Sequence, residues 1–270
     1  MNRTSPLEDD VLASPTGRRF LFLFPHPDDD VFVAGLMQGL LRSGATITCV
    51  WLTSGGAGGD SSVREREIEA AMDILGLPSH DRVLLRLPDM GLLGAMGSGA
   101  DLVAGLVAHH RPDGIFVTAF EGGHVDHDAA NFIAAEAVRR ADADTALFEF
   151  PTYNASGTTR AGGLRINAFP PRSPGVQHAR LDHDAWVCKR AMIRAYGSQA
   201  GVFVIDRLER GRATMLRRGE PYRRFPATRD HRLPPLPGMT GYGQWFNPCA
   251  GISVADVAAA VEASTRARTP

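Results

Sequence analysis

Residues 20–30 read FLFLFPHPDDD and join an apolar run to a histidine and three consecutive acids. The apolar run is rich in Phe and ends at a proline, which predicts a buried β-strand. Adjacent carboxylates repel each other and burial raises their pKa values, so the acids need a stabilising partner, and a bound cation is the simplest. The alternative is that Asp28 or Asp29 only caps the next helix. One acid is enough for a cap, so the whole cluster with His26 favours a site.

Composition bounds the function class. The chain has 270 residues, 44% of them hydrophobic and 22% charged, with a net charge of -1. This balance excludes bulk attraction to nucleic acid or to an anionic membrane. The 3 Cys are far apart and form no CxxC pair, which is typical of a reducing compartment. No apolar run approaches the ~20 residues of a membrane span, and residues 1–18 lack the apolar core of a signal peptide. We expect a cytoplasmic protein that binds no nucleic acid.

Strand and helix patterns alternate through the first part of the chain. Strands are expected at residues 20–24, 47–52, 83–87, 114–119 and 146–150, and helices at 31–42, 63–75, 100–110 and 129–139. This alternation predicts an α/β fold with a Rossmann-like, mostly parallel sheet and helices on both faces. In such sheets ligands bind outside the carboxyl ends of the strands, so the active site is expected there.

The pattern weakens after Phe150. We expect a loop over 152–175, a helix over 184–196, a short strand over 202–205, an irregular Arg- and Pro-rich stretch over 217–241 and a helix over 253–265. The predicted organisation is a flexible arm (1–18) and one domain (19–270) with an irregular C-terminal extension from about 206. Trp245 and Phe246 suit a packed loop, a pocket wall or an oligomer contact, so a homo-oligomer stays open.

A second polar cluster, Gly122-Gly123-His124-Val125-Asp126-His127-Asp128, follows the fourth strand. The i, i+3 spacing of His124 and His127 lets both rings reach one pocket if a helix begins here. Histidine and carboxylate ligands suit Zn²⁺ or another first-row divalent metal such as Fe²⁺. His26, one acid of the first cluster and one His of the second would make three ligands, and the neighbouring acid would be free to act as a base.

HPDD after the first strand and HxDH after the fourth resemble the motifs of the LmbE-like (PIG-L) superfamily, which contains zinc-dependent N-deacetylases. Three further stretches resemble the family: residues 64–76, residues 87–89 and, more loosely, residues 189–199. The resemblance covers roughly residues 18–205 and implies the same Rossmann-like fold. Pro25 departs from the family's usual Ala, and Asp30 stands where Glu is usual.

The resemblance also implies a role for each matching residue. The implied metal ligands are His26, Asp29 and His127. The implied catalytic residues are Asp28 as general base, His124 as the group that assists the tetrahedral intermediate, and Asp126, which orients a neighbouring histidine. Arg64 and Asp89 match positions that contact a sugar-like substrate, and Tyr153 is our own added candidate for substrate binding.

Other polar residues are expected to lie in solvent. This applies to Glu121, to His231, to Lys189 and to the arginines between 217 and 232, although Glu121 could also bind substrate and the arginines could face an anionic substrate. We therefore expect a zinc-dependent hydrolase that removes an N-acetyl group from an amino sugar or a sugar-containing metabolite. The alternatives are an amidase for a larger acyl or peptide-like conjugate, and a ligand-binding member of the fold without turnover.

Overall fold

A seven-stranded sheet forms the centre of the protein in the computed structural model, which describes residues 11–58, 60–154, 156, 165–199, 216–242, 249 and 251–266. Its strands are β1 (Arg19–Phe24), β2 (Thr46–Thr53), β3 (Arg82–Leu87), β4 (Gly114–Thr118), β5 (Ala146–Phe150), β8 (Gln177–Ala179) and β9 (Glu220–Arg224). The order across the sheet is β3-β2-β1-β4-β5-β9-β8. Strands β1 to β5 are parallel, whereas β9 runs antiparallel to β5 and β8 antiparallel to β9. The predicted fold class is confirmed.

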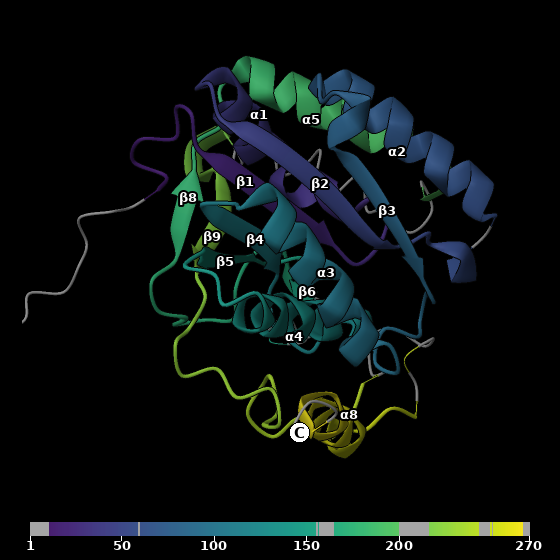
Figure 1. Cartoon of the computed structure of the whole chain (residues 1–270). Helices are drawn as coiled ribbons and strands as arrows, with labels where there is room; N and C mark the ends of the chain where they lie inside the picture. Colours follow the sequence, from purple (N-terminus) through teal and green to yellow (C-terminus); the bar gives the residue numbers. More distant parts are fainter. Residues whose placement is uncertain are drawn as a thin grey trace, which may run out of the picture.

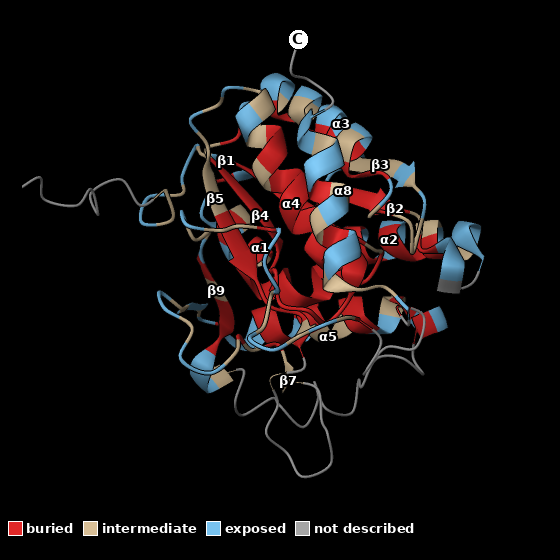
Figure 2. Ribbon diagram, turned by 90° about the horizontal axis from the view of Figure 1, so that it is seen from below, coloured by how far each residue is buried: buried red, intermediate tan, exposed pale blue. Residues whose placement is uncertain are grey.

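Helices cover both faces of this sheet (Figure 1). They are α1 (Ala34–Arg42), α2 (Ser61–Leu75), α3 (Met96–His110), α4 (Val125–Arg140), α5 (His183–Ala195) and α8 (Val254–Arg266). Helices α1, α2 and α5 lie on one face, and α3 and α4 on the other with α8 outside them. Figure 2 shows the central strands β1, β2 and β4 and the inner sides of these helices as mostly buried.

The alternation within β1 explains why both faces are covered. Phe20, Phe22 and Phe24 belong to the core under α1, α2 and α5, whereas Leu21 and Leu23 belong to the core under α3 and α4. Successive side chains of a strand point to opposite faces, so a strand without polar residues can be stable only between two layers. The Phe side gains further from ring packing, since Phe22 stacks on Phe116 at a centroid distance of 4.7 Å.

Several predicted boundaries were wrong. Helix α4 begins at Val125 and not at 129, α3 begins at Met96, and a 3-10 turn over Asp29–Val33 precedes α1. The expected loop over 152–175 contains the short strands β6 (Tyr153–Asn154) and β7 (Arg165–Ile166), which pair with each other. The stretch 217–241 contains β9, which extends the sheet. A strand pattern broken by Pro221 in an Arg-rich context gave no periodic signal.

Some expectations concern residues outside the described part: the strand over 202–205, Trp245 and Phe246, and the first ten residues of the arm. The domain limits at residue 18 and near 206 stay predictions. Within the described residues, no helix combines the length and apolarity required to cross a bilayer.

Candidate active site

The two motifs meet at the point of the sheet where the strand order reverses. HPDD follows β1 and HVDH opens α4 after β4, and these two strands are neighbours, with Phe20 opposite Gly114 and Leu23 opposite Val117. The chain leaves β1 towards β2 on one side, whereas β4 continues to β5 on the other. Such a switch point leaves a crevice at the carboxyl ends of the strands. The rings of His26 and His124 are consequently 4.7 Å apart, although about a hundred residues separate them.

A tight turn after β1 separates the first two acids. Asp28 has a φ of 94°, the left-handed region that few residues other than glycine adopt. It stands at the N-cap of the 3-10 turn, but its side chain makes no cap hydrogen bond. The Asp29 carboxylate instead accepts the backbone N–H of His26 at 3.0 Å. The capping alternative is therefore wrong for Asp28, whose carboxylate points to other partners.

Asp29 lies between two histidines. Its Oδ1 is 3.3 Å from Nε2 of His127 and its Oδ2 is 3.4 Å from Nδ1 of His26. Burial raises the pKa of Asp29, but the charge and hydrogen bond of His127, followed by those of His26, outweigh burial and lower the pKa well below its usual range. The structure thus brings together the three residues that the motif resemblance assigned as ligands.

The opposite edge of His26 faces two more carboxylates. Its Nε2 is 3.2 Å from Asp126 Oδ2 and 3.2 Å from Asp89 Oδ1. Burial lowers the pKa of His26, but hydrogen bonds to Asp126, Asp29 and Asp89 raise it well above its usual value. Asp126 is itself held by the backbone N–H groups of Met90 (2.8 Å) and Leu92 (3.1 Å). The turn after β3 is thereby tied to the turn after β4.

The hydrogen bonds of His124 define the tautomer of its imidazole ring. It is the N-cap residue of α4, and its Nδ1 accepts the backbone N–H of Asp126 at 3.0 Å. A neutral imidazole that accepts at Nδ1 carries its proton on Nε2. Burial, then the nearby His26 and His127, lowers the pKa of His124 well below its usual value, so the neutral form is favoured. His124 is consequently a hydrogen-bond donor in the pocket.

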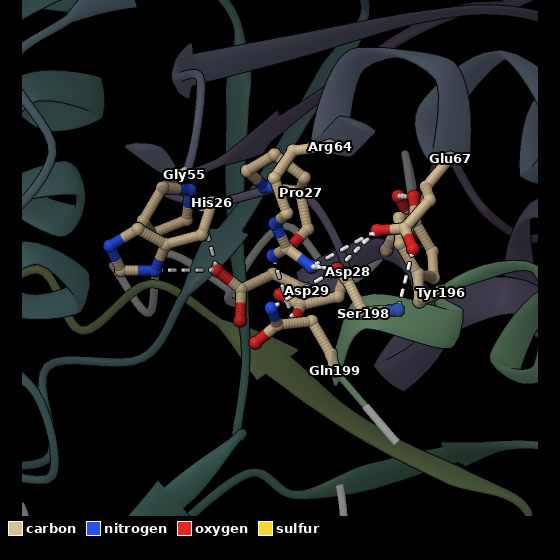
Figure 3. A network of polar contacts seen from close by, with 12 residues as sticks. His26, Pro27, Asp28, Asp29, Gly55, Arg64, Glu67, Tyr196, Ser198 and Gln199 are labelled. Carbon is tan, nitrogen blue, oxygen red and sulfur yellow. Dashed lines mark hydrogen bonds and ion pairs between the residues drawn. The ribbon is translucent and has the colours of Figure 1, made fainter. Parts of the chain in front are cut away.

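Arg64 of α2 is the counter-ion of Asp28 (Figure 3). One guanidinium nitrogen lies 3.1 Å from Asp28 Oδ2 and also donates to the carbonyl of Pro27. Glu67, one turn further along α2, contacts Arg64 at 3.5 Å and accepts from the backbone N–H and the hydroxyl of Ser198 at 2.6 and 2.7 Å. Burial raises the pKa of Asp28 to about 8, although Arg64 lowers it.

The structure also explains the third acid. Asp30 is buried and accepts the indole N–H of Trp51 at 3.2 Å and the hydroxyl of Tyr196. Burial raises the pKa of Asp30 to about 7 in spite of these donors. Its side chain therefore packs under the site, against β2 and the end of α5.

Tyr153 contacts the site through its ring, which lies 5.2 Å from that of His127. A Cβ on Gly123 would lie 1.8 Å from the carbonyl oxygen of Tyr153, so only glycine permits this approach. Burial, then the charge of Asp29, raises the pKa of Tyr153 well above its usual value. The phenol is consequently a neutral donor at the rim of the cluster.

Residues expected in solvent are buried instead. Lys189, the only lysine of the sequence, forms a 2.6 Å ion pair with Glu220. Arg223 and Arg229 both bind Glu149 of β5, the latter at 2.9 Å. Each partner lies far away in the sequence, so the single sequence carried no signal for these pairs.

Two further buried residues were misjudged or missed. The Nε2 of His231 lies 2.9 Å from the side-chain oxygen of Asn131 on α4. Glu121 accepts a hydrogen bond from the backbone N–H of Thr152. The only available signal for Glu121 and Thr152 was their position after β4 and β5, the two strands next to the switch point.

Residues 21–138 match the model of the PIG-L family, described as GlcNAc-PI de-N-acetylase. Over this stretch the chain is similar to the PIG-L family. It contains both the HPDD and the HVDH motif, so the resemblance seen in the sequence is confirmed. A search of curated proteins gave no match.

Several solved structures share the fold of this chain. Teicoplanin deacetylase Orf2, crystallised in a zinc-inhibited form, is 16% identical and has a TM-score of 0.58, with 78% of this chain and 100% of that chain covered. The conserved protein TT1542 from Thermus thermophilus is 24% identical, with a TM-score of 0.57 and coverages of 80% and 96%. N,N'-diacetylchitobiose deacetylase from Pyrococcus horikoshii is 22% identical, with a TM-score of 0.53 and coverages of 77% and 84%. At these identities the similarity establishes the fold.

The donor set fits a divalent cation. Ring nitrogens of His26, His124 and His127 all lie within 4.8 Å of one another, as do donor atoms of His26, Asp89 and Asp126. Three carboxylates, those of Asp126, Asp29 and Asp89, accept hydrogen bonds from His26 and raise its pKa. A proton on His26 offsets that negative charge in the protein alone, and a metal that displaces this proton would offset it better.

Proposed function

We propose that the protein is a zinc-dependent N-deacetylase that acts on a small sugar-like substrate. The observation that carries this proposal is the convergence of His26, Asp29 and His127 with an independently held carboxylate, Asp28, at the switch point of the sheet. The similarity of residues 21–138 to the PIG-L family supports it. The printed names of the relatives, which act on teicoplanin and on diacetylchitobiose, suggest the sugar-like substrate.

His26, Asp29 and His127 would hold the metal. Asp126 and Asp89 hold the Nε2 edge of His26 at 3.2 Å, which leaves its Nδ1 towards Asp29. This arrangement, in which a carboxylate fixes the outer nitrogen of a ligating histidine, raises the basicity of the ligand. When bound, a divalent metal supplies a water molecule of lowered pKa and a positive charge beside the substrate carbonyl.

Asp28 acts as the general base. Burial raises the pKa of Asp28, whereas Arg64, and a bound metal beside it, would favour the ionised carboxylate that accepts a proton. The carboxylate takes a proton from the attacking water while the water oxygen bonds to the acyl carbon. It returns that proton to the amide nitrogen as the C–N bond breaks, which releases acetate and a free amine. Arg64 keeps Asp28 in place at 3.1 Å throughout.

His124 stabilises the oxyanion. The acyl oxygen becomes negative as the water adds, and a neutral imidazole with its proton on Nε2 can donate a hydrogen bond to it. The bond from the backbone N–H of Asp126 to Nδ1 of His124 fixes that tautomer. Arg64, Asp89 and Tyr153 line the same cluster and are proposed to bind substrate hydroxyl groups.

A deacetylation screen tests the proposal. Purified protein is incubated with N-acetylglucosamine, N,N'-diacetylchitobiose and glycosides of N-acetylglucosamine, together with the same amines carrying longer acyl groups, and the freed amine is quantified. We expect release with added zinc and loss of release after chelation. Turnover that survives chelation would refute the metal requirement, and ligand binding without turnover on any amide would show a binding protein. Location in the cytoplasm and a homo-oligomer stay predictions.

A further inference from the structure

Two buried residues behind His127 have no part in the chemistry described so far. Glu121 follows β4 and is 1% exposed, and Thr152 follows β5 and is 0% exposed. A buried carboxylate is costly unless its oxygens accept hydrogen bonds. The hydrogen-bond partners of Glu121 therefore indicate the role of this buried carboxylate.

The hydrogen bonds around Glu121 run in one direction. The backbone N–H of Thr152 donates to Oε1 at 2.7 Å and the side-chain amide of Asn154 donates to Oε2 at 2.8 Å. The Thr152 hydroxyl lies 3.2 Å from the same Oε1 and donates to it as well. That hydroxyl has only one proton. With Glu121 as the acceptor, the remaining close partner of the hydroxyl, Nδ1 of His127 at 2.8 Å, is the donor of the next bond.

We propose that Glu121 and Thr152 form a positioning relay that keeps the proton of His127 on Nδ1. Nε2 is then the nitrogen that faces Asp29 Oδ1, at 3.3 Å, and it is the one that a metal would bind after displacing its proton. The proposal rests on the proposed function for the role of the metal. Its chemistry resembles the common arrangement in which a hydrogen-bond acceptor holds the outer nitrogen of a ligating histidine. Here a hydroxyl between the ring and the carboxylate performs that task.

The backbone of His127 is held separately. The hydroxyl of Thr118, in β4, donates to the carbonyl of His127 at 3.0 Å and does not reach the ring bond described above. The two threonines are both buried and both bonded to the same histidine. Thr118 is therefore a matched control for Thr152, since replacement of either by Val removes one buried hydroxyl next to His127.

The experiment compares Thr152→Val, Thr152→Ser and Thr118→Val in the full chain. Zinc affinity is measured by competition with a chromophoric chelator, and the tautomer of His127 by ¹⁵N NMR of the metal-free protein. We expect Thr152→Val to weaken zinc binding about 10- to 100-fold and to lose the Nδ1-protonated signal. Thr152→Ser, which retains the hydroxyl, should restore both readouts, and Thr118→Val should change neither although it lowers stability.

Three outcomes overturn the relay: a wild-type His127 whose Nδ1 carries no proton, an Nδ1-protonated signal that is unchanged in Thr152→Val, or equal losses of zinc affinity in Thr118→Val and Thr152→Val. If Thr152→Val does not fold, Thr152→Ala, which removes the same hydroxyl, takes the place of Thr152→Val in the experiment. A wild-type protein that binds no zinc would refute the proposed function alone, because the tautomer measured without metal still decides the relay.

Discussion

Replacement of Lys189 by Met should destabilise the protein far more than a usual lysine substitution. Lys189 Nζ is 0% exposed and donates to the carbonyl oxygens of Val31 (2.6 Å) and Phe32 (3.3 Å). It also pairs with Glu220 at 2.6 Å, whose carboxylate accepts the backbone N–H groups of Gly35 and Leu36 at the start of α1. The variant leaves that carboxylate buried without a counter-ion.

The expected magnitude follows from this burial. Removal of one partner of a buried ion pair costs about 3–5 kcal/mol. For a protein of this size each kcal/mol lowers Tm by about 2–4 °C, so Tm should fall by about 6–20 °C. The double variant Lys189→Met/Glu220→Gln should lose less than the sum of the two single variants, because no charge is left buried alone.

Urea and thermal unfolding of the four proteins of this cycle provide the assay. Arg42→Met is the control, because Arg42 joins the same helices, α1 and α5, through Asp182 at 3.0 Å, but both side chains are exposed (44% and 61%). An exposed pair is worth about 0–1 kcal/mol. A loss for Lys189→Met no larger than that for Arg42→Met, or strict additivity in the double variant, would refute the reasoning.

Three further predictions concern the site and its surroundings. Asp28→Asn should retain zinc by elemental analysis and lose about 10²- to 10⁴-fold in deacetylation rate, whereas turnover near wild type would remove Asp28 as the base. Burial lowers the pKa of His231 to about 3, whereas the pKa in the unfolded chain is about 6.5. The unfolded state therefore takes up a proton first as the pH falls from about 6.5 towards 3, and the free energy of unfolding decreases by up to about 1.4 kcal/mol per pH unit. Urea unfolding at pH 7 and pH 4.5 should therefore show a steeper loss for wild type than for His231→Asn, and parallel losses would contradict a neutral buried His231. Gly123→Ala should displace Tyr153 from His127 and lower both Tm and zinc affinity, because the added Cβ would overlap the Tyr153 carbonyl oxygen; an unchanged Tm would show that the turn adapts.

The motifs could be found from the sequence because their chemistry is local. Asp28 and Asp29 adjoin His26 in the chain, and the rule that ligands bind at the carboxyl ends of parallel strands brings His127 to them without knowledge of any contact. The strand pairing β1–β4 then confirmed that the two motifs are neighbours.

The errors share a different origin. Lys189 and His231 were expected in solvent because an isolated polar residue usually lies there. Whether burial is tolerable depends on a partner, and Glu220 and Asn131 are 31 and 100 residues away. Only the antiparallel addition of β9 to the sheet brings the C-terminal region to these positions, and its Pro- and Arg-rich strand has no periodic pattern to predict it.

The three acids that begin the site show why a motif alone underdetermines it. A cation was the simplest way to relieve their repulsion, but the structure gives each carboxylate its own partners. Asp28 pairs with Arg64, Asp29 lies between His26 and His127, and Asp30 turns to Trp51 and Tyr196.

Because the three acids have different partners, each has a different role in the site. Asp29 faces the two histidines proposed as ligands, whereas Asp28 is paired with Arg64, and this difference supports the separate roles proposed for them. Among the described residues, Asp30 accepts hydrogen bonds from two neutral donors, Trp51 and Tyr196, and so anchors the 3-10 turn to β2 and to the end of α5. The Lys189 bonds to Val31 and Phe32 anchor the same turn from its other end. The geometry of the first two acids thus depends on buried residues outside the two motifs as well as on the motifs themselves.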